Sequence, residues 1–173
     1  MLDCDAVYHE QLRSDAALRG AITDAFGDVF GADGLLDRQK LGNIVFSDPA
    51  ALEKLNTIIY THLPRALRQR ADASGADIVA LDAINLIESG LGALCRRTVA
   101  VLAPADVRAA RIMARDGIPE EYARLRIAAQ KNDDFYRAHC TDVLWNDAPT
   151  SEIFERQAGE FFGRLLQELQ KGE

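Results

Sequence analysis

The stretch Leu2-Asp3-Cys4-Asp5-Ala6-Val7-Tyr8-His9-Glu10 decides how this chain is interpreted. Its acidic Asp-x-Asp pair ends a predicted strand, and a histidine follows four residues later. Open parallel sheets bind their ligands at the carboxyl ends of their strands, so Asp5 is a candidate general base. The alternative is that Asp5 caps the helix that follows, since acidic residues after a strand often do so.

Further strands are predicted by nearly continuous apolar runs. Residues 78–81 and 98–102 have the composition of strands that are covered on both faces, and residues 142–145 form a shorter run. Residues 81–87 are expected to continue the first of these strands, which places Glu88 at another strand end. Helices are predicted between the strands, so the pattern indicates an α/β fold built on a parallel sheet.

The residues between the first strand and residue 75 are expected to be helical only. Apolar spacing predicts one amphipathic helix over residues 8–26 and a short helix over residues 37–46. Asp48-Pro49 supplies a cap and a first-turn proline for a long helix that ends near residue 73. These helices are interpreted as a lobe beside the sheet.

Basic and amide side chains recur at helical spacing after residue 104. Helices are predicted to begin at Pro104, Pro119 and Thr150 or Ser151, with Gly117 ending the first. Guanidinium groups bind phosphate oxygens in pairs and stay charged, so the first two helices would suit a lid over phosphates. The alternative is a solvated face balanced by neighbouring glutamates. The side chains concerned are Arg108, Arg111, Arg115, Arg124, Arg126 and Gln130.

The composition bounds the class of protein. The 173 residues are 48% hydrophobic and 27% charged, which predicts one soluble globular domain. The net charge of −7 argues against a general nucleic-acid or anionic-membrane surface. No run approaches the ~18 apolar residues of a membrane helix, so we expect a cytoplasmic protein with no membrane partner. The three cysteines are widely spaced, and no metal site is expected.

A series of motifs follows in order along the chain. They are Leu2-Asp3-Cys4-Asp5 with His9, Asp33-Gly34 with Asp37-Arg38, Val45-Phe46-Ser47-Asp48-Pro49, Leu55-Asn56, Ile87-Glu88-Ser89-Gly90-Leu91, Arg111 with Arg115-Asp116-Gly117-Ile118-Pro119, Arg126 with Gln130, and Asn146-Asp147. In combination, these motifs resemble the dephospho-CoA kinase family from residue 2 to about residue 166. The resemblance implies a parallel-sheet P-loop fold of the nucleoside-monophosphate-kinase type, with a helical acceptor lobe and an arginine lid.

The resemblance also implies an activity and a division of the chain. Such enzymes transfer the γ-phosphoryl group of ATP, with Mg²⁺, to the ribose 3′-hydroxyl of dephospho-CoA in the last step of coenzyme A biosynthesis. ATP and dephospho-CoA are therefore the expected partners. Within one domain of 173 residues, residues 6–74 would form the CoA-binding lobe, 75–103 and 140–173 the core, and 104–139 the lid and following helices.

Roles for single residues follow from matched positions. Asp5 matches the base that accepts the hydroxyl proton, and Arg111 and Arg115 match lid positions over the transferring phosphates. The remaining matched residues are Asp3, His9, Glu88, Arg126 and Gln130 for the substrate and Asn146 for the nucleotide.

The chain departs from the family pattern in three places. Tyr60-Thr61 stand where the family usually has His-Pro, and Ile84-Asn85-Leu86 stand where it usually has Pro-Leu-Leu. There is also no G-x-x-x-x-G-K-[ST] loop, and none of the four lysines follows a glycine.

The missing loop leads to an expectation about the chain as a whole. We expect an N-terminally incomplete kinase in which Met1 is an internal methionine and phosphoryl transfer is impaired. The alternatives are a non-catalytic CoA-binding remnant or interaction protein, and a related kinase for another nucleoside.

Overall fold

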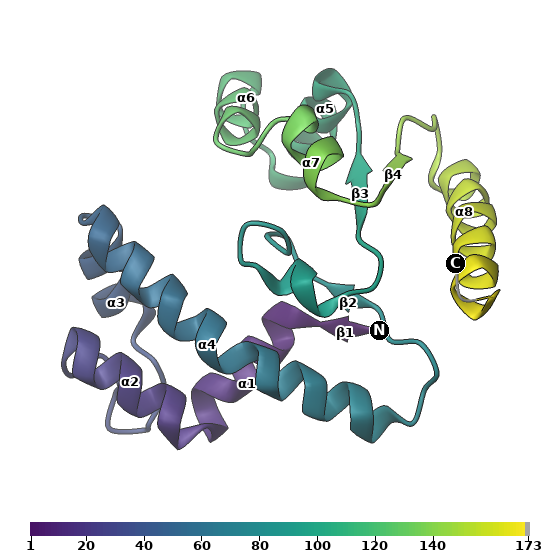
Figure 1. Cartoon of the computed structure of the whole chain (residues 1–173). Helices are drawn as coiled ribbons and strands as arrows, with labels where there is room; N and C mark the ends of the chain where they lie inside the picture. The colour runs from purple at the N-terminus through teal and green to yellow at the C-terminus, as the bar shows by residue number, and fades with distance from the viewer. Residues whose placement is uncertain (172–173) are drawn as a thin grey trace. The chain divides into compact units, whose positions relative to one another are not determined.

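A computed structural model of the protein describes residues 1–171. Residues 172–173, the end of the predicted core segment, lie outside the described part. The chain divides into two compact units, Met1–Arg96 and Arg97–Glu173 (Figure 1). Each unit contains one pair of parallel strands. The predicted parallel α/β architecture is therefore confirmed, while the assignment of lobe, core and lid segments stays a prediction.

The strand pair of the first unit is short. β1 (Leu2–Asp3) pairs with β2 (Leu81–Asp82), with Leu2 opposite Leu81 and Asp3 opposite Asp82. The strand predicted over residues 78–81 and continued over 81–87 is therefore wrong in its bounds. Because α1 (Cys4–Ser14) begins directly after Asp3, β2 has no extended partner beyond Asp82. The chain turns there and enters the short 3₁₀ helix η1 (Leu91–Leu94).

The helix predicted over residues 8–26 is two helices. α1 ends at Ser14 and α2 (Ala16–Phe26) begins two residues later, with Asp15 between them in an extended conformation at φ −88° and ψ 102°. The Asp15 carboxylate accepts hydrogen bonds from the amides of Ala17 and Leu18 at 2.8 and 3.1 Å. Apolar periodicity continues across Asp15, but this local cap ends one helix and starts the next.

The helices predicted over residues 37–46 and from Pro49 to about residue 73 are confirmed. α3 (Arg38–Val45) and α4 (Pro49–Ser74) lie at the expected positions. Asp48 caps α4 through the amide of Ala50, and Gly75 ends the helix in the left-handed region at φ 62°. α4 packs against α1, α2 and α3.

Two apolar clusters meet along α4. The first fills the space among the helices and consists of Leu12, Leu18, Ile22, Val29, Leu41, Val45 and Leu55. The second joins α4 to α1 and η1 and consists of Cys4, Val7, Leu63, Ala66, Leu67 and Leu91, with Leu2 and Leu81 of the strands packed on it. The beginning of α4 thus stabilises the helical lobe, and its middle supports the strand pair.

The second unit is built around β3 (Val99–Leu102) and β4 (Asp142–Trp145), which pair in parallel with Val99 opposite Asp142. The predicted helix starts are confirmed by α5 (Ala105–Asp116), α6 (Glu120–Ala128) and α8 (Ser151–Lys171). The short helix α7 (Asp133–His139) was not predicted. Arg97 ties the strands to α8, because its guanidinium bonds Asp142 at 2.7 Å and Glu168 at 3.2 Å.

None of the helices in the described part of the chain combines the length and apolar character that crossing a membrane requires.

Replacing Asp15 by alanine should lower the free energy of unfolding by about 1 kcal/mol, the usual value of an N-cap. Asp15→Asn should keep most of the stability, because an amide oxygen also caps. Hydrogen bonds from the Leu18 and Ala17 amides lower the pKa of Asp15 below its usual 3.8. Its carboxylate therefore stabilises the fold above that pH, and the contribution is lost as the pH falls through the lowered value.

Urea unfolding measures this effect. Asp24→Ala is the matched control, since Asp24 is exposed on the same helix and caps nothing in the described structure. Equal unfolding free energies for Asp15→Ala and Asp24→Ala would contradict the capping role.

Candidate functional sites

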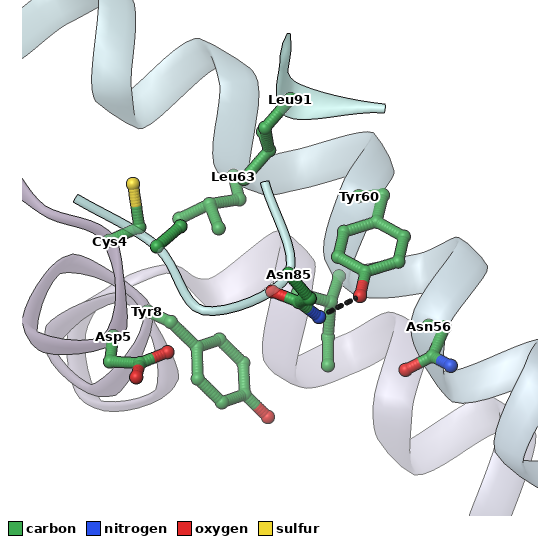
Figure 2. Close-up of a pocket in the computed structure, with 10 residues that line it drawn as sticks. Cys4, Asp5, Tyr8, Asn56, Tyr60, Leu63, Asn85 and Leu91 are labelled. Carbon is green, nitrogen blue, oxygen red and sulfur yellow. Dashed lines mark hydrogen bonds between the residues drawn. The ribbon is translucent and has the colours of Figure 1, made fainter. Parts of the chain in front are cut away.

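The first unit contains a pocket between α1 and α4 with a volume of about 150 Å³. We call it the α1–α4 pocket (Figure 2). Helix α1 contributes polar side chains at one side of the pocket. Helix α4 contributes side chains that follow one another at intervals of one helical turn, and the turn after β2 completes the lining. Its lining consists of Cys4, Asp5, Tyr8, Asn56, Ile59, Tyr60, Leu63, Ala83, Asn85 and Leu91.

The two aspartates at the end of β1 have different tasks. Asp3 is the N-cap of α1, and its carboxylate accepts from the amide of Ala6 at 3.0 Å. Asp5 lies in the first turn of α1 and lines the pocket (Figure 2). The alternative in which Asp5 caps the helix is therefore wrong, and Asp5 lines the pocket instead.

Cys4 lies between these aspartates and is buried. Burial, followed by the negative charge of Asp5, raises the pKa of its thiol to about 11. The thiol is therefore protonated and unreactive at neutral pH.

The predicted residues His9 and Glu88 lie in the same unit but do not line the pocket. His9 follows Asp5 by about one turn of α1, and Arg38 Nη2 lies 3.5 Å from each of its ring nitrogens. The negative charge of Glu88 acts on Tyr60, where it adds to burial in raising the pKa of the phenol. Arg38 is a cation to which sequence reasoning gave no role, although the Asp37-Arg38 motif contained the signal.

The second unit contains a larger pocket of about 650 Å³, which we call the α5–α8 pocket. The predicted residues Arg111 and Asn146 meet there, with Arg111 Nη2 donating to Asn146 Oδ1 at 3.0 Å. The backbone amide of Asn146 bonds the carbonyl of Leu102 at 2.7 Å, so this residue extends the strand pair. The lining residues are Arg111, Asn146, Ala148, Pro149, Thr150, Ser151, Glu152, Phe154 and Glu155.

Most of that lining was missed from the sequence. Residues 148–155 connect the carboxyl end of β4 to the first turns of α8. The available signal was a helix start placed soon after a strand end, where parallel sheets bind ligands. Helix N-terminal amides favour anions, but at the start of α8 the amides of Ile153 and Phe154 already bond Thr150, and Glu152 and Glu155 add negative charge.

The other predicted arginines form ion pairs. Asp116 bonds Arg115 Nε at 2.7 Å and also bonds Arg126. Arg108 forms an ion pair with Asp133 at 3.6 Å and also donates to Gln130 Oε1 at 3.3 Å. Except for Arg111, these lid residues do not line the α5–α8 pocket. The carboxylates that pair with these arginines are mainly aspartates, not the neighbouring glutamates of the alternative interpretation. Glu120 pairs with Arg124.

Asp116 is the electrostatic centre of this cluster. The hydrogen bond from Arg115 is the largest cause that lowers its pKa to about 2, and Arg126 acts in the same direction. The carboxylate therefore stays charged throughout the neutral and mildly acidic range, and it holds two lid arginines together.

Parallel strands with polar side chains after their carboxyl ends define the class of α/β proteins that bind ligands at that edge of the sheet. Comparisons identify the family within that class. A model of the dephospho-CoA kinase family matches residues 1–152. The dephospho-CoA kinase of Streptomyces avermitilis is 35% identical over 168 residues, which are 96% of this chain and 82% of that protein. The enzyme of Thermobifida fusca is 31% identical over 98% of this chain and 85% of its own length.

Two solved structures have the same fold as this chain. A crystal structure from Thermus thermophilus superposes with a TM-score of 0.72 at 30% identity, covering 95% of this chain and 83% of that one. The dephospho-CoA kinase of Campylobacter jejuni, at 21% identity, has the same fold with a TM-score of 0.65, covering 99% of this chain and 85% of its own. This chain belongs to the dephospho-CoA kinase family.

Replacing Arg115 by glutamine should raise the pKa of Asp116 from about 2 toward its usual 3.8, because the strongest of its two cationic partners is lost. Carboxyl-carbon NMR titration measures this value. Asp142, whose pKa is lowered by Arg97, is the internal control and should titrate unchanged. If the titration midpoint of Asp116 is the same in the variant and the parent, Arg115 is not the main partner of Asp116 in solution.

Proposed function

We propose that this chain carries the acceptor site and the lid of a dephospho-CoA kinase, which phosphorylates the ribose 3′-hydroxyl of dephospho-CoA with ATP. The observation that carries the proposal is the position of Asp5 in a pocket at the carboxyl end of β1, in a chain of this family. We further propose a cytoplasmic location, in keeping with a family of soluble, ATP-using enzymes.

In this proposal Asp5 accepts the proton of the attacking hydroxyl, and Asp3 positions it by fixing the start of α1. His9, with Arg38 beside it, and Glu88 contact the acceptor around the pocket. Phosphoryl transfer needs positioning and charge neutralisation more than covalent participation by the protein.

Arginines supply the charge neutralisation. Arg111, oriented by Asn146, binds phosphate oxygens of the nucleotide, and Asn146 contacts the nucleotide from the end of β4. Arg115, Arg126 and Gln130 complete the lid, with the two arginines exchanging the Asp116 carboxylate for phosphate when the substrate is bound.

Mg²⁺ enters as part of the ATP substrate. The described residues contain no cluster of three or more His, Cys, Asp or Glu side chains that would cage a metal ion. The proposal needs no such cluster, because Mg²⁺ is commonly held by substrate phosphates, waters and one or two carboxylates.

The sequence contains no loop that would hold the β- and γ-phosphates. We therefore propose that these 173 residues bind dephospho-CoA but transfer phosphate poorly. The test is to assay the chain alone and the same chain preceded by about 30 residues from a family member, comprising a strand, the G-x-x-x-x-G-K-[ST] loop and a helix. Formation of CoA is followed by mass spectrometry.

The extended chain should form CoA and the 173-residue chain should not. Rapid ATP-dependent formation of CoA by the 173-residue chain would overturn the proposed impairment. Binding of CoA that is unaffected by ATP in both forms would favour the alternative, a non-catalytic CoA-binding protein.

In the extended chain, Asp5→Asn should lower kcat by about 10²–10⁴-fold, the usual contribution of a general base, while the Kd for dephospho-CoA changes little. Asn is nearly the same size and keeps the hydrogen-bonding oxygen, so the fold should persist. Asp24→Asn, an exposed position on α2, is the matched control. A kcat within about twofold of the parent for Asp5→Asn would remove Asp5 from the proposed mechanism.

A further inference from the structure

The α1–α4 pocket contains a hydrogen bond between side chains from distant parts of the sequence. Asn85 Nδ2 donates to the hydroxyl oxygen of Tyr60 at 2.8 Å. Tyr60 belongs to α4 and Asn85 to the turn after β2, and Figure 2 shows the two polar groups pointing toward one another. These residues lie in two of the segments where the sequence departs from the family pattern.

In this hydrogen bond the amide of Asn85 is the donor and the hydroxyl oxygen of Tyr60 is the acceptor. A tyrosine hydroxyl has one proton and can also accept, whereas the amide nitrogen of asparagine can only donate. Because the Tyr60 oxygen accepts from Asn85, its own O–H remains available to a second acceptor. Burial is the largest cause that raises the pKa of Tyr60 above its usual 10, so the phenol keeps this proton at neutral pH.

The pocket places this donor together with an acceptor. Asp5 lines the same cavity of about 150 Å³. A carboxylate accepts a proton or a hydrogen bond, and Tyr60 offers a hydrogen bond. Two hydroxyl groups on one ligand complement this pair chemically, because one can donate to Asp5 while the other accepts from Tyr60. A ribose presents such a pair at its 3′ and 2′ positions.

We propose that the Tyr60–Asn85 pair makes the acceptor site selective for a ribose, with Tyr60 donating its O–H to the 2′-hydroxyl while Asp5 engages the 3′-hydroxyl. This inference rests on the proposed function. Asn85 is a positioning residue, since it acts by turning the Tyr60 proton toward the ligand. A sugar without the 2′-hydroxyl leaves the Tyr60 donor unpaired, which is the kind of mismatch that polar sites reject.

Equilibrium binding tests the inference without ATP. The 173-residue chain is titrated with dephospho-CoA and with its 2′-deoxy analogue by isothermal calorimetry. The parent chain should bind the ribose compound about 5- to 100-fold more tightly, which is the effect of leaving one hydrogen-bonding group unpaired. Tyr60→Phe should bind both compounds with nearly equal Kd values, because it keeps the ring and loses only the donor.

Asn85→Asp is the sharper variant. A carboxylate at this position can only accept, so it draws the Tyr60 proton to itself and away from the ligand. The preference for ribose should fall as in Tyr60→Phe, although the side chain has the same shape. Asn43→Asp, an exposed position on α3, adds the same charge in the same unit and should retain the parent preference.

The outcomes separate the two proposals. If the folded parent chain binds neither compound, the proposed function fails and this inference fails with it. If it binds both compounds equally, or if Tyr60→Phe keeps the preference, the inference is overturned while the proposed function stands. If Tyr8→Phe abolishes the preference and Tyr60→Phe does not, the donor has been assigned to the wrong tyrosine.

Discussion

The first unit depends on the burial of one face of α4. Leu55 lies in the cluster that holds the helical lobe together, while Leu63 and Leu67 lie in the cluster beneath the strands. Leu67 is 1% exposed, and full burial of such a side chain stabilises a fold by roughly 1.5–3 kcal/mol. A single helix therefore connects two cores.

The same helix determines the site. Residues one turn apart on a helix share a face, so the burial of Leu63 also brings Asn56 and Tyr60 to the α1–α4 pocket. The strand pair contributes through its ends: α1 starts immediately after Asp3, and this places Asp5 one residue into the helix. The site is thus a consequence of how α4 packs and of where β1 stops.

The second unit contains several ion pairs between arginines and carboxylates. Arg97 and Asp142 form a bidentate pair that joins β3 to β4, with distances of 2.9 and 2.7 Å. Arg115 and Arg126 both pair with Asp116, whose side chain is 23% exposed. The two arginine side chains are 73% and 55% exposed, and ion pairs between solvent-exposed side chains contribute little to stability.

The sequence by itself determined the parallel α/β class, most of the helices, the family, and the residues Asp5, Arg111 and Asn146 as site candidates. Those properties are local or depend on periodicity and motif order. The structure adds that Asp15 divides the first helix and that Asp3 is the cap instead of Asp5, both through local hydrogen bonds to amides two or three residues further on. Pairing with a distant strand decided that β2 ends at Asp82. The Tyr60–Asn85 hydrogen bond and the contact of Arg111 with Asn146 join residues 25 and 35 positions apart. Such pairs leave no periodic signal, because side-chain packing, and not spacing along the chain, brings them together.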